Sequence, residues 1–477
     1  MVPLPSVTSY RHRISLDGQW SFALDPEDTG SQESWYSDRK FDASIQIPGS
    51  WEEQGYGFAP HSNPLWGWNK THEYEGAAWY QRTVEIPSEW DGKAIELILT
   101  GVRWRSRVWI DDEYTGEQER LSVPHRYDLT EFIKPGSQHR LSIQIDNRML
   151  YSLPESHINS LQTATRWGGI TGGILLEARS KNAIQHIRCY PNVTERSFDF
   201  EVTAAIADAT FEVSITNPQN GEKVTGITTL KGGSGSVSVK PGSDAPLWWD
   251  DAPFLYHAQF ILRDGETILD GLEKRVGLRE ISVDGKQILL NGKPVFLRGY
   301  VDCCIFPLTG YPAQDIEQYR HQFKVARRHG FNHVRLHSWT APQPFWDAAD
   351  EIGMLVQTEL PNWSRVYDYR EIPPPSDLHR FLMHELEAII QEYHFHPSWV
   401  MFSNGNELAG NWDGHPDLIE LTARGKELDP TRLYTDQTGF GQIPAPSRPV
   451  DYYIQSCNWH PPKKIYDAAT DNTAEDF

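Results

Sequence analysis

The sequence contains few cysteines and no metal-ligand spacing. These shortages exclude a fold stabilised by disulfides and a fold stabilised by zinc. Its 477 residues include four cysteines, Cys189, Cys303, Cys304 and Cys457. Their positions fit neither a disulfide framework nor a zinc site. We expect the adjacent Cys303 and Cys304 to be two reduced, buried thiols rather than a disulfide. No metal and no cofactor are expected.

Long apolar runs and an excess of positive charge are also lacking. The net charge of −21 disfavours nucleic acid as a partner, because phosphate binding needs a basic surface. No segment approaches the roughly 18 unbroken apolar residues of a membrane span. Residues 1–13 are polar, unlike a signal peptide. The sequence therefore predicts a cytoplasmic protein with no membrane partner, although a trimmed secreted form and a homo-oligomer both remain compatible with it.

Short alternating strands, separated by turn residues, fill the first part of the chain. Residues 94–99 and 141–145 alternate between apolar and polar side chains, and so do residues 198–202 further along. Such strands, punctuated by Gly, Pro and Asp, are typical of β sandwiches. We therefore predict one β domain over residues 1–180 and a second over residues 181–277.

After residue 278 the pattern changes to strands that alternate with helices, which predicts a parallel sheet with right-handed crossovers. A closed barrel of this kind needs eight strands and about 250 residues. Residues 278–477 are therefore expected to form an incomplete (β/α)8 barrel. The six expected strands are residues 294–299, 332–336, 355–359, 399–402, 433–436 and 452–455.

Helix signals are clear between these strands. Asp315 precedes a segment whose apolar residues recur at helical spacing, with Tyr319 and Phe323 on one face, and the segment ends at Gly330. Two further helices are expected, around residues 345–352 and over residues 377–393.

Polar residues follow the predicted strands, where a β/α barrel has its active site. So many polar groups at one end of the strands are hard to explain by structure alone. They are Arg298, Asp302, Arg335, His337, Glu359, Asn362, Asn406, Glu407, Asp436, Asn458 and Trp459.

One segment carries a specific resemblance. Residues 396–407, which end in Asn406-Glu407, resemble the acid/base segment of glycoside hydrolase family 2, the family of β-galactosidases and β-glucuronidases. The likeness extends over nearly the whole chain. The other matching segments are residues 16–22, 47–51, 79–80, 101–102 and 167–170 for a sugar-binding jelly roll, 247–249 and 253–256 for a sandwich, and 277–280 and 290–299 for the barrel entry.

The resemblance implies a multidomain fold of the β plus α/β class. Residues 1–180 would form a jelly-roll sugar-binding domain, residues 181–277 an immunoglobulin-like β-sandwich, and residues 278–477 a partial TIM-barrel catalytic domain. The implied activity is that of a retaining, exo-acting β-glycosidase, with an oligosaccharide as its partner.

The resemblance also implies roles for individual residues. Glu407 would be the acid/base that protonates the leaving oxygen, and Asn406 would hold the 2-hydroxyl of the sugar. Other residues would lie around the terminal sugar, as ligands or stacking platforms. They are Arg298, Asp302, Arg335, His337, Glu359, Trp363 and Trp459.

Structural alternatives stand beside these roles. Arg335 could instead form an ion pair with Glu359, and His337 could be a satisfied core histidine. Packing is as good an explanation for both tryptophans as stacking. Arg335 and Arg298 would suit a uronic acid through paired hydrogen bonds to its carboxylate, but both also fit neutral sugars.

The second carboxylate of the mechanism is missing from the pattern. Family members use a nucleophilic glutamate on the seventh strand, about 5 Å from the acid/base. Glu475 and Asp476 lie in a polar tail without a preceding strand, so neither is assigned this role. We expect a C-terminally truncated family member whose nucleophile lies beyond residue 477. The alternative is a non-catalytic, carbohydrate-binding pseudo-enzyme.

Overall fold

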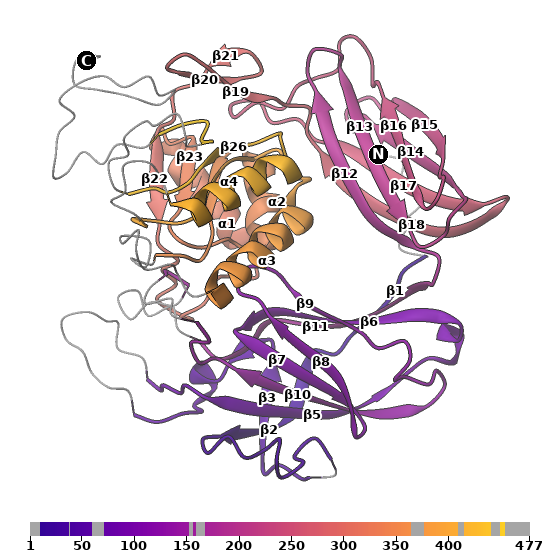
Figure 1. The fold of residues 1–477 in the computed structure, drawn as a ribbon, viewed down its shortest axis with the longest axis vertical. Helices are drawn as coiled ribbons and strands as arrows, with labels where there is room; N and C mark the ends of the chain where they lie inside the picture. The colour runs from indigo at the N-terminus through magenta and orange to yellow at the C-terminus, as the bar shows by residue number, and fades with distance from the viewer. Residues whose placement is uncertain are drawn as a thin grey trace.

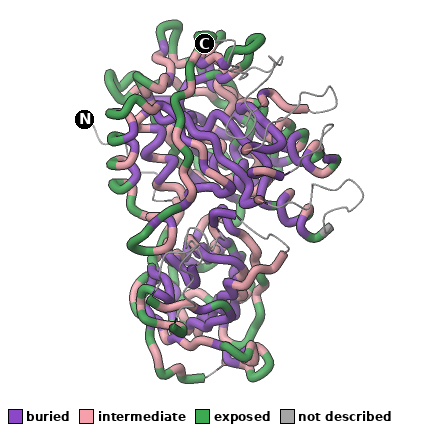
Figure 2. Tube along the Cα trace, turned by 90° about the vertical axis from the view of Figure 1, so that its left-hand side faces the viewer, coloured by how far each residue is buried: buried purple, intermediate pink, exposed green. Residues whose placement is uncertain are grey.

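The computed structural model folds the chain into three domains (Figure 1). The jelly roll lies at the bottom of the view, the sandwich at the upper right and the barrel segment at the upper left. Figure 2 shows that the buried residues gather in the interiors and the exposed ones on the outer surfaces. The structure describes residues 10–37, 39–59, 71–151, 156–158, 167–363, 376–408, 415–439 and 449–453.

Two antiparallel sheets form the jelly roll, because alternate side chains of their strands share one core. In β10 (Gln138–Asp146) the side chains of Leu141, Ile143 and Ile145 are fully buried in that core. One sheet has the order β1-β11-β6-β9 with β4 beside β11, and the other has the order β3-β2-β5-β10-β7-β8. The remaining bounds are β1 His12–Ser15, β2 Gly18–Asp25, β3 Ala43–Ile47, β4 Gly49–Ser50, β5 Ala77–Glu85, β6 Lys93–Arg103, β7 Arg105–Ile110, β8 Glu113–Glu119, β9 His125–Asp128 and β11 Gly169–Ser180, with short 3-10 helices at Glu52–Gln54 and Ser88–Trp90.

The second domain is a sandwich of a three-stranded and a four-stranded sheet, ordered β12-β13-β16 and β15-β14-β17-β18. Its core is rich in phenylalanine, and Phe198, Phe200, Phe211 and Phe260 are all fully buried. The strands are β12 Ile184–Asn192, β13 Ser197–Ala204, β14 Thr210–Thr216, β15 Lys223–Thr229, β16 Ser234–Val239, β17 Tyr256–Asp264 and β18 Thr267–Val276.

A small antiparallel sheet, β19-β20-β21, leads into the barrel segment, where five parallel strands are ordered β22-β23-β24-β25-β26. Helices pack against this sheet (Figure 1). The bounds are β19 Ile281–Asp284, β20 Gln287–Leu290, β21 Lys293–Pro294, β22 Gly299–Asp302, β23 His333–Leu336, β24 Leu355–Glu359, β25 Trp399–Ser403, β26 Leu433–Thr435, α1 Ile316–Arg328, α2 Gln343–Ile352, α3 Ser376–Tyr393 and α4 Pro416–Leu428.

Local sequence explains the helix limits. The Asp315 side chain accepts a hydrogen bond from the Glu317 backbone N–H and caps α1. The predicted apolar face, with Tyr319 and Phe323, is buried. Gly353 takes a left-handed conformation at the end of α2.

The predicted architecture of jelly roll, immunoglobulin-like sandwich and incomplete barrel is confirmed. One strand was wrongly placed: the first parallel strand is residues 299–302, whereas residues 293–294 pair with β20 in the small sheet. Of the expected sixth strand, Tyr452 and Tyr453 are not in a strand, and residues 454–455 lie outside the described residues.

The cysteines of the described part agree with the prediction of reduced thiols. Cys189, Cys303 and Cys304 are free, although only Cys304 of the adjacent pair is fully buried. Cys457 lies outside the described residues. None of the helices in the described part of the chain is long and apolar enough to span a membrane.

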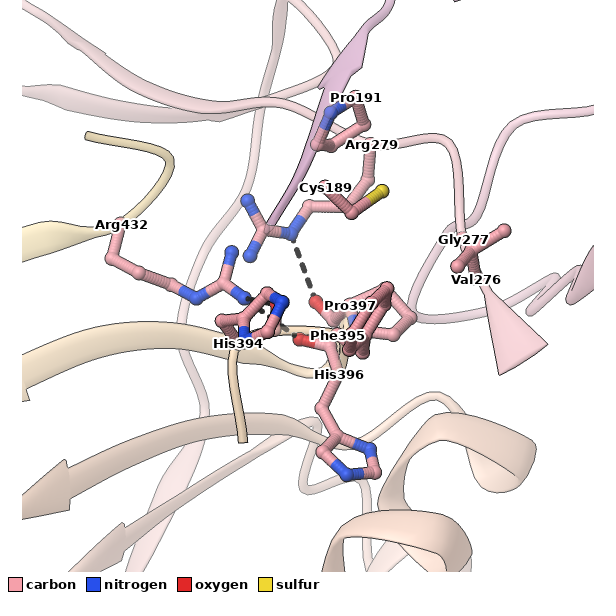
Figure 3. Close-up of a pocket in the computed structure, with 10 residues that line it drawn as sticks. All are labelled: Cys189, Pro191, Val276, Gly277, Arg279, His394, Phe395, His396, Pro397 and Arg432. Carbon is pink, nitrogen blue, oxygen red and sulfur yellow. Dashed lines mark hydrogen bonds between the residues drawn. The ribbon is translucent and has the colours of Figure 1, made fainter. Parts of the chain in front are cut away.

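Two buried arginines lie at the amino-terminal end of the barrel sheet, and one of them, Arg279, comes from the segment that follows the sandwich. Figure 3 shows Arg279 and Arg432 directed toward the turn that precedes β25. Arg279 uses all three of its side-chain nitrogens, donating to the carbonyl oxygens of Pro397 (2.9 Å), Thr431 and Trp399. Its guanidinium is fully buried, and burial lowers its pKa well below the usual value. These bonds join the segment after the sandwich to the barrel sheet.

Candidate active site

The carboxyl ends of the parallel strands bring the candidate residues together. Arg335 lies on β23, Glu359 ends β24, and Asn406 and Glu407 follow β25. Thr438 follows β26 and bridges to Asn406. Because neighbouring parallel strands end at one edge, residues separated by about a hundred positions meet there.

A buried hydrogen-bond network surrounds Arg335. Its Nε donates to Glu359 Oε1 at 2.6 Å, and its Nη2 donates to Asn406 Oδ1 and to Thr438 Oγ1, each at 2.6 Å. Glu359 has no exposed surface and also accepts bonds from Thr438 Oγ1 (2.6 Å) and the Ser338 backbone N–H (2.7 Å). The charge of Arg335 is therefore matched by a carboxylate held on both oxygens.

This network fixes the orientation of the Asn406 amide. The Arg335 guanidinium holds its oxygen, and no partner among the described residues holds its Nδ2. Asn406 is 1% exposed, and a buried donor without a partner carries a free-energy cost unless a ligand supplies one. The buried Nδ2 of Asn406 is thus left able to donate to a ligand.

The backbone holds Glu407 in an unusual conformation. Its φ is +52°, in the left-handed region that residues other than glycine seldom adopt. The Glu407 N–H donates to the Thr438 carbonyl at 2.6 Å, and the Asn406 N–H donates to the Asn362 carbonyl at 3.0 Å. Gly439 packs against this pair, and a Cβ there would lie 2.3 Å from Asn406 Oδ1 and 2.6 Å from Glu407 Cγ.

Aromatic rings line the other side of Glu407. The Trp363 indole N–H donates to Glu407 Oε2 at 3.0 Å. The Trp363 ring contacts His337 at 4.9 Å and His157 at 5.3 Å between centroids. Burial lowers the pKa of both imidazoles to about 3, so both are neutral at ordinary pH. The Glu407 carboxylate is therefore bound by the Trp363 indole, which two uncharged imidazole rings pack against.

The structure brings six predicted site residues together: Arg335, His337, Glu359, Trp363, Asn406 and Glu407. The structural alternative proposed for Arg335, an ion pair with Glu359, is present. It does not remove Arg335 from the site, since the same guanidinium also orients Asn406. Trp459 lies outside the described residues.

The structure does not bring two predicted site residues, Arg298 and Asp302, to this group. Arg298 precedes β22, is exposed, and donates to the Gly330 carbonyl at 2.7 Å, so it lies at the amino end of the sheet. Asp302 ends β22, but its side chain accepts from Gln322 of α1 and from the Cys304 N–H, both at 2.9 Å. It therefore points to the helix layer. With Arg298 remote and Arg335 paired, the suggested double-arginine site for a uronic acid is not formed.

Sequence reasoning missed two contributors. Thr438 follows β26 by three residues, and the rule that looks for polar residues at strand ends favoured Asp436 instead. His157 belongs to the jelly roll, and no local signal connects it with a barrel about 180 residues further on. In the described part of the chain, no cluster of three or more His, Cys, Asp or Glu side chains could hold a metal ion.

Comparison with known families assigns each domain in turn. Residues 14–175 match the model "Glycosyl hydrolases family 2, sugar binding domain". Residues 182–279 match "Glycosyl hydrolases family 2", and residues 281–456 match "Glycosyl hydrolases family 2, TIM barrel domain". The three matches follow each other along the chain in the order of the three domains described above.

Similar proteins agree with these matches. A β-galactosidase of Thermoanaerobacter pseudethanolicus is 25% identical over 398 residues, which are 78% of this chain and 50% of that protein. A β-glucuronidase of Paenibacillus borealis is 23% identical, over 90% of this chain and 74% of that protein. The chain thus spans about half the length of the β-galactosidase.

Among solved structures, the β-glucuronidase of Ruminococcus gnavus superimposes with a TM-score of 0.76 at 22% sequence identity. The match covers 91% of this chain and 73% of the other. At this level of identity the likeness shows a common fold.

Proposed function

The chain belongs to glycosyl hydrolase family 2, and from this premise we propose that it carries the acid/base half of a retaining β-glycosidase, with Glu407 as the acid/base. The substrate is the terminal β-linked sugar of an oligosaccharide. One observation carries the proposal. Glu407 and Asn406 lie side by side at the carboxyl edge of the sheet, Glu407 held by Trp363 and Asn406 by Arg335, and the Asn406 Nδ2 has no partner among the described residues.

The geometry supports a division of roles. Trp363 holds Oε2 of Glu407, so the other carboxyl oxygen is available to transfer a proton to the departing glycosidic oxygen. In the second step the same group would take a proton from water. The Asn406 Nδ2 would bind the 2-hydroxyl of the sugar, in a bond that strengthens as positive charge develops on the ring.

The nucleophile is not assigned among the described residues. Glu359 is the other carboxylate of the network, but it has no exposed surface and is engaged by Arg335, Ser338 and Thr438. A carboxylate held in this way cannot approach the anomeric carbon. Glu359 instead holds Arg335, and Arg335 orients Asn406.

The test uses the complete natural protein and a panel of nitrophenyl β-glycosides, including the galactoside, glucuronide, glucoside and mannoside. Glu407→Ala should remove most hydrolysis. With a 2,4-dinitrophenyl substrate, which needs no acid, azide should restore turnover and yield the β-glycosyl azide. The β configuration of that product identifies Glu407 as the acid/base of a retaining mechanism.

Two results would overturn the proposal. One is hydrolysis that Glu407→Ala leaves unchanged. The other is a protein that binds a β-glycoside in equilibrium measurements yet cleaves none of the panel, which would make it a carbohydrate-binding pseudo-enzyme.

A further inference from the structure

We propose that His157 of the jelly-roll domain is a positioning residue for Glu407, because its imidazole holds Trp363 where the indole N–H can bind the carboxylate. The inference rests on the proposed role of Glu407. It adds a function for the jelly roll within the same site, supplied by a residue that neither the strand pattern nor the Asn-Glu pair indicates.

His157 is firmly anchored to the barrel. The described segment 156–158 is buried throughout, and His157 itself is 5% exposed. Its backbone N–H donates to Ser338 Oγ at 2.9 Å, and the Ser338 N–H donates to Glu359 Oε2 at 2.7 Å. The jelly-roll segment is thus bound to the serine that also fixes the Arg335 and Glu359 pair.

Three rings pack mutually beside Glu407. The centroids of His157 and His337 are 4.2 Å apart, and each ring also contacts Trp363. The His337–Trp363 pair is edge to face, an arrangement that aromatic pairs prefer. Without the His157 ring, Trp363 loses one of these two neighbours and gains space in which to turn.

The orientation of Trp363 matters for the chemistry. Its indole N–H to Glu407 Oε2 bond, at 3.0 Å, fixes which carboxyl oxygen is occupied and which can carry the proton. The chain from His157 through Trp363 therefore ends on the group that must be placed within hydrogen-bond reach of the leaving oxygen. The imidazole is neutral, so it acts by packing and does not stabilise the ionised carboxylate.

Leaving-group dependence separates this role from general structural support. In the complete natural protein, His157→Ala should lower kcat/KM about 10- to 100-fold for a phenyl or alkyl glycoside, whose departure needs acid. It should change kcat/KM less than about threefold for a 2,4-dinitrophenyl glycoside, which departs unaided. His157→Phe keeps a ring and should restore the first value to within about threefold.

The matched control is His186→Ala, which removes an exposed histidine of β12 in the sandwich domain, whose ring contacts Gln391 of α3. It should leave both substrates unaffected. An equal loss for both substrates in His157→Ala would reduce His157 to structural support and overturn the proposal.

A second readout needs no activity. In a spectrum of 15N-labelled indole groups, Trp363→Phe identifies the Trp363 resonance. In the parent protein this resonance should shift when the pH is lowered, and in Glu407→Gln it should not. His157→Ala should abolish the shift and His157→Phe should keep it.

If the Trp363 resonance of His157→Ala shifts with pH as it does in the parent protein, the positioning role is overturned, even in a protein that cleaves no glycoside. Conversely, failure of the glycosidase proposal would appear as hydrolysis independent of Glu407 while the Trp363 resonance still responds to His157. The two failures are therefore distinguishable.

Discussion

The two ends of the barrel sheet bury arginine for different purposes. At the amino end, each of the three side-chain nitrogens of Arg279 donates to a backbone carbonyl. At the carboxyl end, Arg335 binds Glu359, Asn406 and Thr438, and leaves the Asn406 Nδ2 without a partner among the described residues. Bonds from every nitrogen to backbone carbonyls stabilise a junction, whereas a network that leaves a buried amide donor without a partner prepares a site for a ligand.

Glu407→Gln should lower activity without lowering stability. Hydrolysis of a poor leaving group should fall about 10²- to 10⁴-fold, the range for loss of a general acid/base. The thermal midpoint should stay within about 1 °C, because the side chain is half-buried and makes one hydrogen bond, to Trp363, among the described residues. Kinetics and calorimetry on the same preparation check both parts. A large loss of stability would make Glu407 a structural residue like Arg279.

Arg279→Met should instead lower stability without lowering activity. It removes the Arg279 donor from the carbonyls of Pro397, Thr431 and Trp399, of which Thr431 keeps a bond from Arg432, and unpaired buried groups cost about 1–3 kcal/mol each. The free energy of unfolding should fall by about 3–5 kcal/mol, measured by urea denaturation, with kcat/KM unchanged at low temperature. Arg279→Lys can keep one of the three bonds, so its free energy of unfolding should lie between those of the parent protein and Arg279→Met. Lost activity in a folded Arg279→Met protein would show that the two ends are coupled.

Some regions of the structure were also easier to predict from the sequence than others. α1 was predictable because its cap, Asp315, and its buried face, Tyr319 and Phe323, all lie within one local segment. The Asn406-Glu407 pair was found for the same reason, as a polar pair directly after the apolar strand β25. Where the signal is contained in adjacent residues, the prediction and the structure agree.

The errors arise where several readings of a segment are equally good. Residues 294–302 offer more than one short strand, and choosing residues 294–299 placed Arg298 at the carboxyl end of the sheet instead of the amino end. Asp302 ends the correct strand, but alternation gives it the same face as Tyr300, and Gln322 of α1 binds both side chains. His157 reaches the site through domain packing, which no local pattern records.

A smaller effect is expected from Gly439→Ala, which tests whether the site tolerates displacement. The new Cβ would meet Asn406 Oδ1 and Glu407 Cγ, and φ is +90°. We expect kcat/KM to fall about 10-fold, as expected for misplaced catalytic groups. Gly330→Ala is the control, because φ is +86° there and nothing lies within 4 Å of the added Cβ. It should cost about 1 kcal/mol of stability without a kinetic change. Equal kinetic effects in both variants would contradict the close packing at Gly439.

The smallest expected effect is a loss of unfolding free energy at low pH that is due to His157. Burial lowers the pKa of His157 to about 3, below its value near 6.5 in an unfolded chain. Unfolding therefore takes up a proton between these values, so the stability contributed by the neutral imidazole is present above pH 6.5 and is lost as pH falls toward 3. Between pH 6.5 and 5.5 the loss should be about 1 kcal/mol for this one group. His157→Phe, which cannot titrate, should lack that part of the loss in urea denaturation at the two pH values. An equal loss of unfolding free energy in parent and variant between the two pH values would mean that His157 is not buried as a neutral ring. The rings beside Glu407 would then not be uncharged.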